Sequence, residues 1–217
     1  MFLVESSKNL FIVNHPLIQD KLTRIRNHLT QKKDFKENLS EIATLMAYEV
    51  FKDIPLDEIE VETPITKVIG KTLTKTIILS PILRAGLGMT NGFEYVVPNA
   101  IISHVGLYRD EETLKPQKYF FKYPKNIKNI SDALVFILDP MLATGGTADA
   151  AIKELKKVGF KNITLVSIVG APVAIKKINH NHLDVKIFLA ALDKELNDDG
   201  YIVPGLGDAG DRIFGTK

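Results

Sequence analysis

The chain has 217 residues, of which 45% are hydrophobic and 25% charged, a composition typical of a globular protein with a substantial core. Its 28 basic and 26 acidic side chains leave a net charge of +2, and no basic stripe indicates a nucleic-acid partner. The absence of cysteine excludes disulfides, thiolate metal sites and cysteine nucleophiles. No apolar run approaches the ~18 residues that span a bilayer, so we expect a soluble, cytoplasmic protein without a membrane partner.

The first predicted element is a helix in the segment DFKENLSEIATLMAYEV. Its apolar residues share one face of a 3.6-residue period, and Asp34 and Glu37 form a capping box at its start. The residues on that face are Phe35, Leu39, Ile42, Ala43, Met46 and Val50. We interpret residues 1–70 as an N-terminal helical arm.

After residue 70 the pattern changes to short apolar runs bounded by turn residues. These runs are TIILSP, AIISHVGLY, ALVFILDP, NITLVSIVG and VKIFLAAL. They alternate with helical segments, most clearly after ALVFILDP, where an apolar face ends at Gly159. The alternation predicts an α/β fold with a mostly parallel sheet flanked by helices, and ligands at the carboxyl ends of the strands. We treat residues 1–217 as a single domain.

Residues 108–128 interrupt this alternation with charges, two prolines and the aromatic side chains Tyr119, Phe120, Phe121 and Tyr123. We interpret them as an inserted β-hairpin flap. Its aromatics could form a stacking platform for bases, but packing onto the sheet or onto a second subunit is the interpretation we favour.

One internal loop has the properties of a phosphate site. A strand ends at Asp139, and Thr144, Gly145, Gly146 and Thr147 then lead directly into a helix. Glycine N–H groups, hydroxyls and a helix amino terminus together suit an anion. The alternative is a plain tight turn with Thr147 as the helix N-cap. A Walker A loop is excluded because no lysine lies between Asp139 and Lys153.

The C-terminal stretch GLGDAG, with Gly205, Gly207 and Gly210, matches the G-x-G-x-x-G pattern of dinucleotide-binding proteins. That pattern works only when a helix and a second strand follow it. Only seven residues follow Gly210, so a nicotinamide-dependent dehydrogenase is a rival function that rests on a misplaced glycine pattern alone.

The segment DPMLATGGT resembles the ribose-phosphate loop of type I phosphoribosyltransferases, enzymes that use phosphoribosyl diphosphate (PRPP). Pro140 replaces the second acid of the commoner form, as in the uracil phosphoribosyltransferases. Further segments resemble that narrower family: HPLIQ, SPILRAGLGM, GLYRDEET and the C-terminal YIVPGLGDAGDRIFGTK. The resemblance covers essentially the whole chain.

The resemblance implies that uracil and PRPP are converted to UMP and diphosphate in pyrimidine salvage. Arg84 and Arg109 would hold the diphosphate, where a planar guanidinium can bind two oxygens at once. Uracil would be bound by Ile202, Gly207, Asp208 and Ala209, and Asp208 and Arg109 would be the catalytic residues, with Asp208 also near PRPP. The ribose 5-phosphate loop would comprise Asp139, Pro140, Met141, Leu142, Ala143, Thr144, Gly145, Gly146 and Thr147.

The family also implies Mg²⁺ as cofactor, bound mainly through the PRPP diphosphate and water, with no dedicated metal site on the protein. It implies a homodimer or higher homo-oligomer. Some members are activated by a purine nucleotide such as GTP, and no residue of this chain decides that point.

Structural rather than functional roles are also possible interpretations of these residues. Arg109 is next to three acidic residues and could form a surface ion pair, and Asp208 could be an ordinary turn residue. His180 and His182 form H-x-H, which we assign to a polar helix end rather than to a metal site. Rival functions are a regulatory protein that binds nucleotide and RNA, and a transferase acting on a purine or on orotate.

Overall fold

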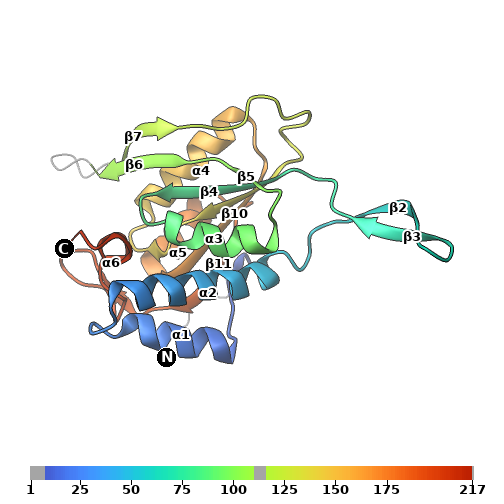
Figure 1. Ribbon diagram of the computed structural model, residues 1–217. Coiled ribbons are helices and arrows are strands. Elements are labelled where there is room, and N and C mark those ends of the chain that lie inside the picture. The colour runs from blue at the N-terminus through green and yellow to red at the C-terminus, as the bar shows by residue number, and fades with distance from the viewer. Residues whose placement is uncertain (1–7, 110–115, 217) are drawn as a thin grey trace.

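A nine-stranded sheet forms the centre of the computed structural model, which describes residues 8–109 and 116–216 (Figure 1). The main strand order is β1-β11-β10-β8-β4-β6-β7, and all neighbours on this path are parallel except β6 and β7. Its strands are β1 (Leu10–Ile12), β4 (Ile77–Leu83), β5 (Ile101–Ile102), β6 (Val105–Arg109), β7 (Pro116–Phe121), β8 (Leu134–Leu138), β9 (Met141–Leu142), β10 (Asn162–Gly170) and β11 (Lys186–Leu192).

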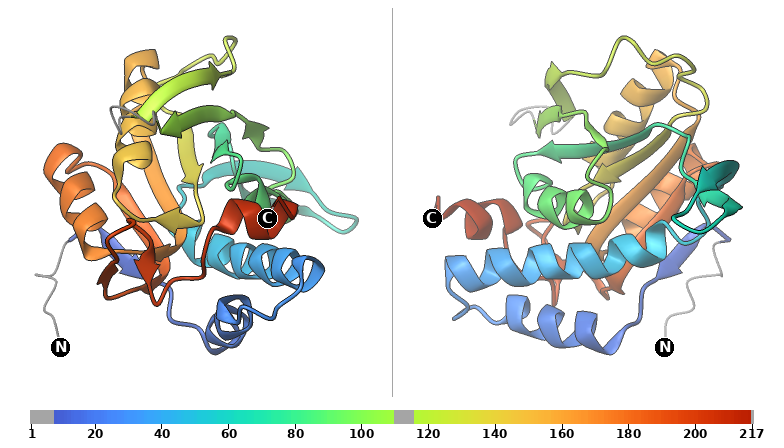
Figure 2. Two further views of the ribbon diagram at one scale, coloured as in Figure 1. Left: turned by 90° about the vertical axis from the view of Figure 1, so that its left-hand side faces the viewer. Right: turned by 45° about the vertical axis from the view of Figure 1, so that its right-hand side comes forward.

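Helices cover both faces of this sheet (Figure 2). One face carries α2 and α3, with α1 packed on α2 and α6 beside it, and the other face carries α4 and α5. The helices are α1 (Pro16–Arg26), α2 (Lys32–Val50), α3 (Leu87–Val96), α4 (Gly146–Val158), α5 (Pro172–Asn181) and α6 (Ala209–Phe214). Each face has its own hydrophobic core, so the α/β prediction is confirmed.

The central strands have the composition that two-sided burial requires. Six of the seven residues of β4 are buried, and β8 and β10 are similarly apolar, because helices exclude water from both sides of a parallel sheet. The helix after ALVFILDP is α4, and its predicted terminator Gly159 caps it in a left-handed conformation. The run AIISHVGLY forms two strands, β5 and β6, rather than one.

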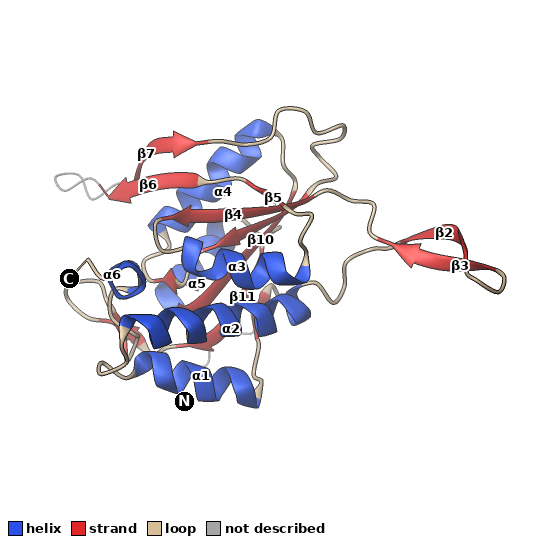
Figure 3. Ribbon diagram, in the orientation of Figure 1, coloured by secondary structure: helices blue, strands red, loops and turns tan. Residues whose placement is uncertain are grey.

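The N-terminal arm is only partly helical, which corrects the prediction for residues 1–70. It contains β1 and a two-stranded hairpin of β2 (Asp57–Glu62) and β3 (Lys67–Thr72) that projects from the body of the molecule (Figure 3). Apolar and charged residues alternate in DEIEVE, which is typical of a strand. The capping box is also wrong, because α2 begins at Lys32 and its N-cap is Gln31.

The predicted flap does contain a hairpin strand. β7 pairs antiparallel with β6, although the paired strands begin at Val105 rather than at residue 108. Residues 110–115 of the predicted flap lie outside the described residues. Phe121 and Tyr123 pack against the core of the α4 face, as the packing interpretation expects. Tyr119 and Phe120 are exposed.

Another short pair, β12 (Glu195–Leu196) and β13 (Ile202–Val203), precedes α6. Among the described residues no helix is long and apolar enough to cross a membrane.

Candidate active site

The residues predicted to bind ligands follow strands that end at one edge of the sheet. Arg84 follows β4, Arg109 ends β6, and Asp139 follows β8. A fourth polar residue, Asp193, follows β11. Because these strands are parallel, their carboxyl ends meet at the same edge, where open α/β sheets bind ligands.

A pocket of about 240 Å³ lies where the strand-end loops meet the C-terminal segment. Ala85 comes from the loop after β4, and Met141 and Ala143 come from the loop after β8. The C-terminal segment contributes Gly200, Tyr201, Ile202, Gly207, Asp208, Ala209 and Gly210. All four predicted uracil residues therefore line the same pocket as two residues of the predicted phosphate loop.

The phosphate loop turns tightly into α4. Gly145 is the N-cap of this helix with φ of +72°, so the alternative with Thr147 as N-cap is wrong. A Cβ on Gly145 would lie 3.2 Å from Ala174 of α5, a tight contact, and the positive φ would strain any other residue there. The Thr144 hydroxyl accepts a 3.4 Å hydrogen bond from the Gly146 N–H. The amino end of α4 thus lies near the carboxyl ends of the strands, and a helix amino terminus is a favourable site for an anion.

Asp139 is partly buried at the start of this loop. Burial raises the pKa of its carboxyl to about 7, although the backbone N–H of Met141 lowers the pKa. Carboxyl groups whose pKa lies near neutral are common at functional sites.

The C-terminal segment owes its shape to glycine. Gly205 has φ of +60°, and a Cβ there would lie 2.1 Å from the carbonyl oxygen of Ile202, so no other residue fits. Gly207 also has positive φ, at +75°. Asp208 is the N-cap of α6, and its Oδ1 accepts a 2.9 Å hydrogen bond from the Asp211 N–H. The exposed carboxylate of Asp208 therefore has a fixed position at the pocket wall.

A buried ion pair anchors this segment to α1. The guanidinium of Arg26 donates to both carboxylate oxygens of Asp193, at 2.6 and 2.8 Å, and to the Gly205 carbonyl oxygen at 2.7 Å. Asp193 in turn accepts from the Gly205 N–H at 2.8 Å. Both polar backbone groups of Gly205 are thus held by residues distant in sequence.

Arg84 directly follows β4 and Arg109 is the last residue of β6, and these two strands are neighbours because β4 pairs with β6 through Leu83 and Gly106. Arg84 is exposed, its guanidinium lies 3.5 Å from the carboxylate of Asp211, and it approaches the Phe214 ring. So long a contact at an exposed position is a weak ion pair, and it leaves the guanidinium at the edge where an anion would bind.

The prediction missed several residues of this region. The pocket is also lined by Ala85, Gly200, Tyr201 and Gly210. Two of these, Tyr201 and Gly210, lie in the C-terminal stretch that carries the family resemblance. Asp193 carried a signal of its own, because like Asp139 it is an acid directly after a buried strand. Nothing in the sequence pointed to Arg26.

A parallel sheet flanked by helices, with an acid and a glycine loop that opens α4 and arginines after the adjacent strands, defines a type I phosphoribosyltransferase. A family model of uracil phosphoribosyltransferase matches residues 12–216. The uracil phosphoribosyltransferase of Malacoplasma penetrans (strain HF-2) is 55% identical over 207 residues, which cover 95% of this chain and 99% of that protein. The chain therefore belongs to the uracil phosphoribosyltransferase family.

Other relatives agree with this assignment. The uracil phosphoribosyltransferase of Acholeplasma laidlawii (strain PG-8A) is 54% identical over 208 residues, which cover 96% of this chain and 99% of that protein. The solved structure of the AQ2163 protein from Aquifex aeolicus superposes with a TM-score of 0.90 at 39% identity, covering 96% of this chain and 99% of that one.

Proposed function

We propose that the protein transfers the phosphoribosyl group of PRPP to uracil, forming UMP and diphosphate in pyrimidine salvage. The observation that carries this proposal is the shared pocket, which residues of both the phosphate loop and the GLGDAG segment line. Such a pocket can hold a flat base against one wall and a sugar phosphate against the other. Family membership supports the same reaction.

The loop from Asp139 to Thr147 is the part we assign to the ribose 5-phosphate. α4 begins within this loop, at Gly146, and the N–H groups and dipole of a helix amino terminus favour an anion. Arg84 and Arg109 are assigned to the diphosphate, because they follow adjacent strands and carry permanent charge. Asp139 would face the ribose.

Uracil is neutral, so its recognition depends on hydrogen bonds rather than on charge. Backbone groups of Ile202, Gly207, Asp208 and Ala209 suit this task, because their donor or acceptor character does not change with pH. A site with fixed polar groups rejects a base whose groups leave them unpaired. Orotate would need a cation in the base pocket, and this pocket has the carboxylate of Asp208 instead.

The chemistry follows from charge separation. Positive charge develops on the sugar as diphosphate leaves, so carboxylates at the sugar and arginines at the diphosphate both stabilise the transition state. We assign Asp208 to the base and sugar, and Arg109 to the leaving group. We assign Mg²⁺ to the diphosphate of PRPP and to water, because this ion keeps much of its water shell and needs few protein ligands. When bound, Mg²⁺ would neutralise part of the diphosphate charge.

The test is an assay of the purified protein with PRPP, Mg²⁺ and each of uracil, cytosine, orotate, hypoxanthine and guanine, in the presence and absence of GTP. We expect UMP and diphosphate from uracil alone, and a large loss of turnover in Asp208→Asn with folding retained. Absence of UMP above background would refute the proposal. Tight RNA binding without turnover would favour the regulatory rival.

We also propose that the protein is a homodimer or higher homo-oligomer, with the β2–β3 hairpin as a contact surface. One face of this hairpin presents Ile59, Val61 and Val68 to solvent. A lone two-stranded hairpin is only marginally stable in water, so cover from a second subunit would account for its apolar face.

A further inference from the structure

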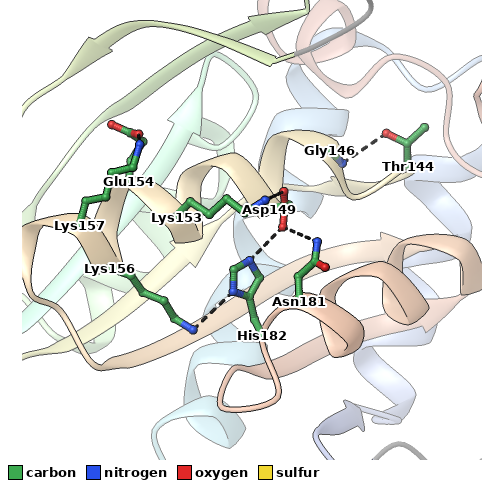
Figure 4. Close-up of polar contacts among 9 residues, drawn as sticks. All are labelled: Thr144, Gly146, Asp149, Lys153, Glu154, Lys156, Lys157, Asn181 and His182. Carbon is green, nitrogen blue, oxygen red and sulfur yellow. Dashed lines mark hydrogen bonds and ion pairs between the residues drawn. The ribbon is translucent and has the colours of Figure 1, made fainter.

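A polar cluster lies behind the phosphate loop, between α4 and the end of α5 (Figure 4). At its centre is Asp149, in the first turn of α4, whose carboxylate points toward α5. Oδ1 accepts from Asn181 Nδ2 at 2.8 Å and contacts His182 Nε2 at 3.0 Å. Oδ2 accepts from Lys153 Nζ at 2.7 Å. Both oxygens of this acid are therefore bonded, two of the partners coming from the end of α5.

The surroundings of His182 define its protonation state. The ring is almost fully buried, and its Nδ1 lies 3.4 Å from the ammonium group of Lys156. An ammonium group can only donate, so Nδ1 is the acceptor and Nε2 carries the hydrogen that is donated to Asp149. Burial lowers the pKa of His182 and outweighs the opposite effect of the hydrogen bond to Asp149, which agrees with a neutral ring.

This cluster connects directly to the phosphate loop. The Asp149 N–H donates a 3.0 Å hydrogen bond to the carbonyl oxygen of Gly145, which closes the first turn of α4. At its other end α5 packs against the loop, where Ala174 approaches Gly145. The two ends of α5 thus contact the N-cap of α4 and its first turn, so a shift of α5 would move the N–H groups that face the anion site.

We propose that Asp149 and His182 are positioning residues for the phosphate loop. Through the hydrogen bond from Nε2, His182 fixes the carboxylate of Asp149, and this carboxylate fixes the first turn of α4 in the orientation that binds the 5-phosphate. The inference rests on the proposed function, in which this loop receives the ribose 5-phosphate. Neither residue lines the pocket with the base segment.

Two substitutions of His182 separate its two nitrogens. In His182→Gln the amide group can replace Nε2–H as donor to Asp149, whereas in His182→Asn the shorter amide can replace only Nδ1, near Lys156. Asp149→Ala removes the centre of the cluster. Lys157→Ala is the matched control, because Lys157 also forms an ion pair within α4, with Glu154, but is exposed and outside the cluster.

The measurements are KM for PRPP, KM for uracil, the calorimetric Kd of ribose 5-phosphate, and the thermal midpoint. We expect Asp149→Ala and His182→Asn to raise KM for PRPP and Kd for ribose 5-phosphate on the order of tenfold or more, since small misplacements of binding groups are costly. In both variants KM for uracil should change far less. His182→Gln and Lys157→Ala should behave like the wild type.

A purely structural role would lower the thermal midpoint without the selective loss of phosphate affinity, and that result would overturn the inference. Equal effects of His182→Gln and His182→Asn would overturn it as well. Failure of the proposed function would look different, because the wild type itself would make no UMP. The calorimetric comparison with ribose 5-phosphate needs no turnover and would still decide between the two outcomes.

Discussion

The two acids assigned to the sugar side of the site have opposite environments. Asp139 is partly buried after β8, and burial raises its pKa to about 7. Asp208 is exposed, and its carboxylate is held by the N–H of Asp211 at the start of α6. Burying an acid costs stability when it is charged, so the environment of Asp139 favours its protonated form.

Replacing Asp139 by Asn should make the protein more stable at alkaline pH. The folded wild type keeps a proton up to about pH 7, whereas the unfolded chain loses it near pH 3.8. Over that interval the wild-type free energy of unfolding falls as pH rises, because the folded state binds more protons. We expect Asp139→Asn to gain about 1–3 kcal/mol over wild type between pH 5 and pH 8, measured by urea unfolding.

Asp198→Asn is the control, because Asp198 is exposed in the turn before β13. It should show no such gain. If the advantage of Asp139→Asn were the same at both pH values, the assignment of a raised pKa to Asp139 would be wrong. We expect the same variant to lose PRPP affinity, since it removes an acid from the ribose side of the site.

At the scale of elements, α1 holds the C-terminal segment in place. Its last residue, Arg26, joins Asp193 and Gly205. A second contact starts from the C-terminal segment: the guanidinium of Arg212 in α6 donates to the carbonyl oxygens of Ile25, Leu206 and Asn27. The C-terminal segment that lines the pocket is thus held in place by a helix more than 160 residues earlier in the chain.

Arg26→Ala should weaken both folding and uracil binding. It leaves the buried carboxylate of Asp193 without its cation, which costs about 3 kcal/mol of stability, and it removes the donor to the Gly205 carbonyl oxygen. We expect KM for uracil to rise more than KM for PRPP. The control is Arg24→Ala, since Arg24 forms an exposed pair with Asp20 on the same helix and should cost about 0.5 kcal/mol or less. An equal rise in both KM values would argue against a specific role of Arg26 in uracil binding.

At the scale of the whole molecule, the β2–β3 hairpin is an amphipathic element whose apolar face is exposed. Ile59, Val61 and Val68 share one face, and the other face carries the pairs Glu58 with Lys71 and Glu62 with Lys67. This division matches a strand pair that buries one side. The described part of one subunit leaves the apolar side exposed.

A double variant, Ile59→Gln with Val61→Gln, should shift the protein toward a lower mass in sedimentation velocity. Loss of apolar contact across the interface is the physical reason. Ile69→Gln is the control, because Ile69 is also exposed but opposes Glu60 on the charged face. A wild type that sediments as a monomer at all concentrations would refute the proposed assembly.

Patterns of local spacing explain what could be predicted. The buried strands, the amphipathic faces of α2 and α4, and the glycine that ends α4 depend on residues close together in the chain, so period and turn chemistry reveal them. The hairpin of β2 and β3 differs from the predicted helical arm although its alternation is local, because the helical period of α2 ends at Val50 and does not continue toward residue 70. The division of AIISHVGLY into β5 and β6 follows from pairing with β4 and β7, which a single run of letters does not show.

The sequence by itself determined the fold class, the family resemblance and the segments that form the pocket, because each depends on short motifs in a fixed order. Only the tertiary structure decided which residues hold those segments in place. Arg26 with Asp193, and Asp149 with His182, are separated by 167 and 33 positions. Such pairs leave no periodic signal, since their contact arises from parallel strands and packed helices that bring distant residues to one edge of the sheet.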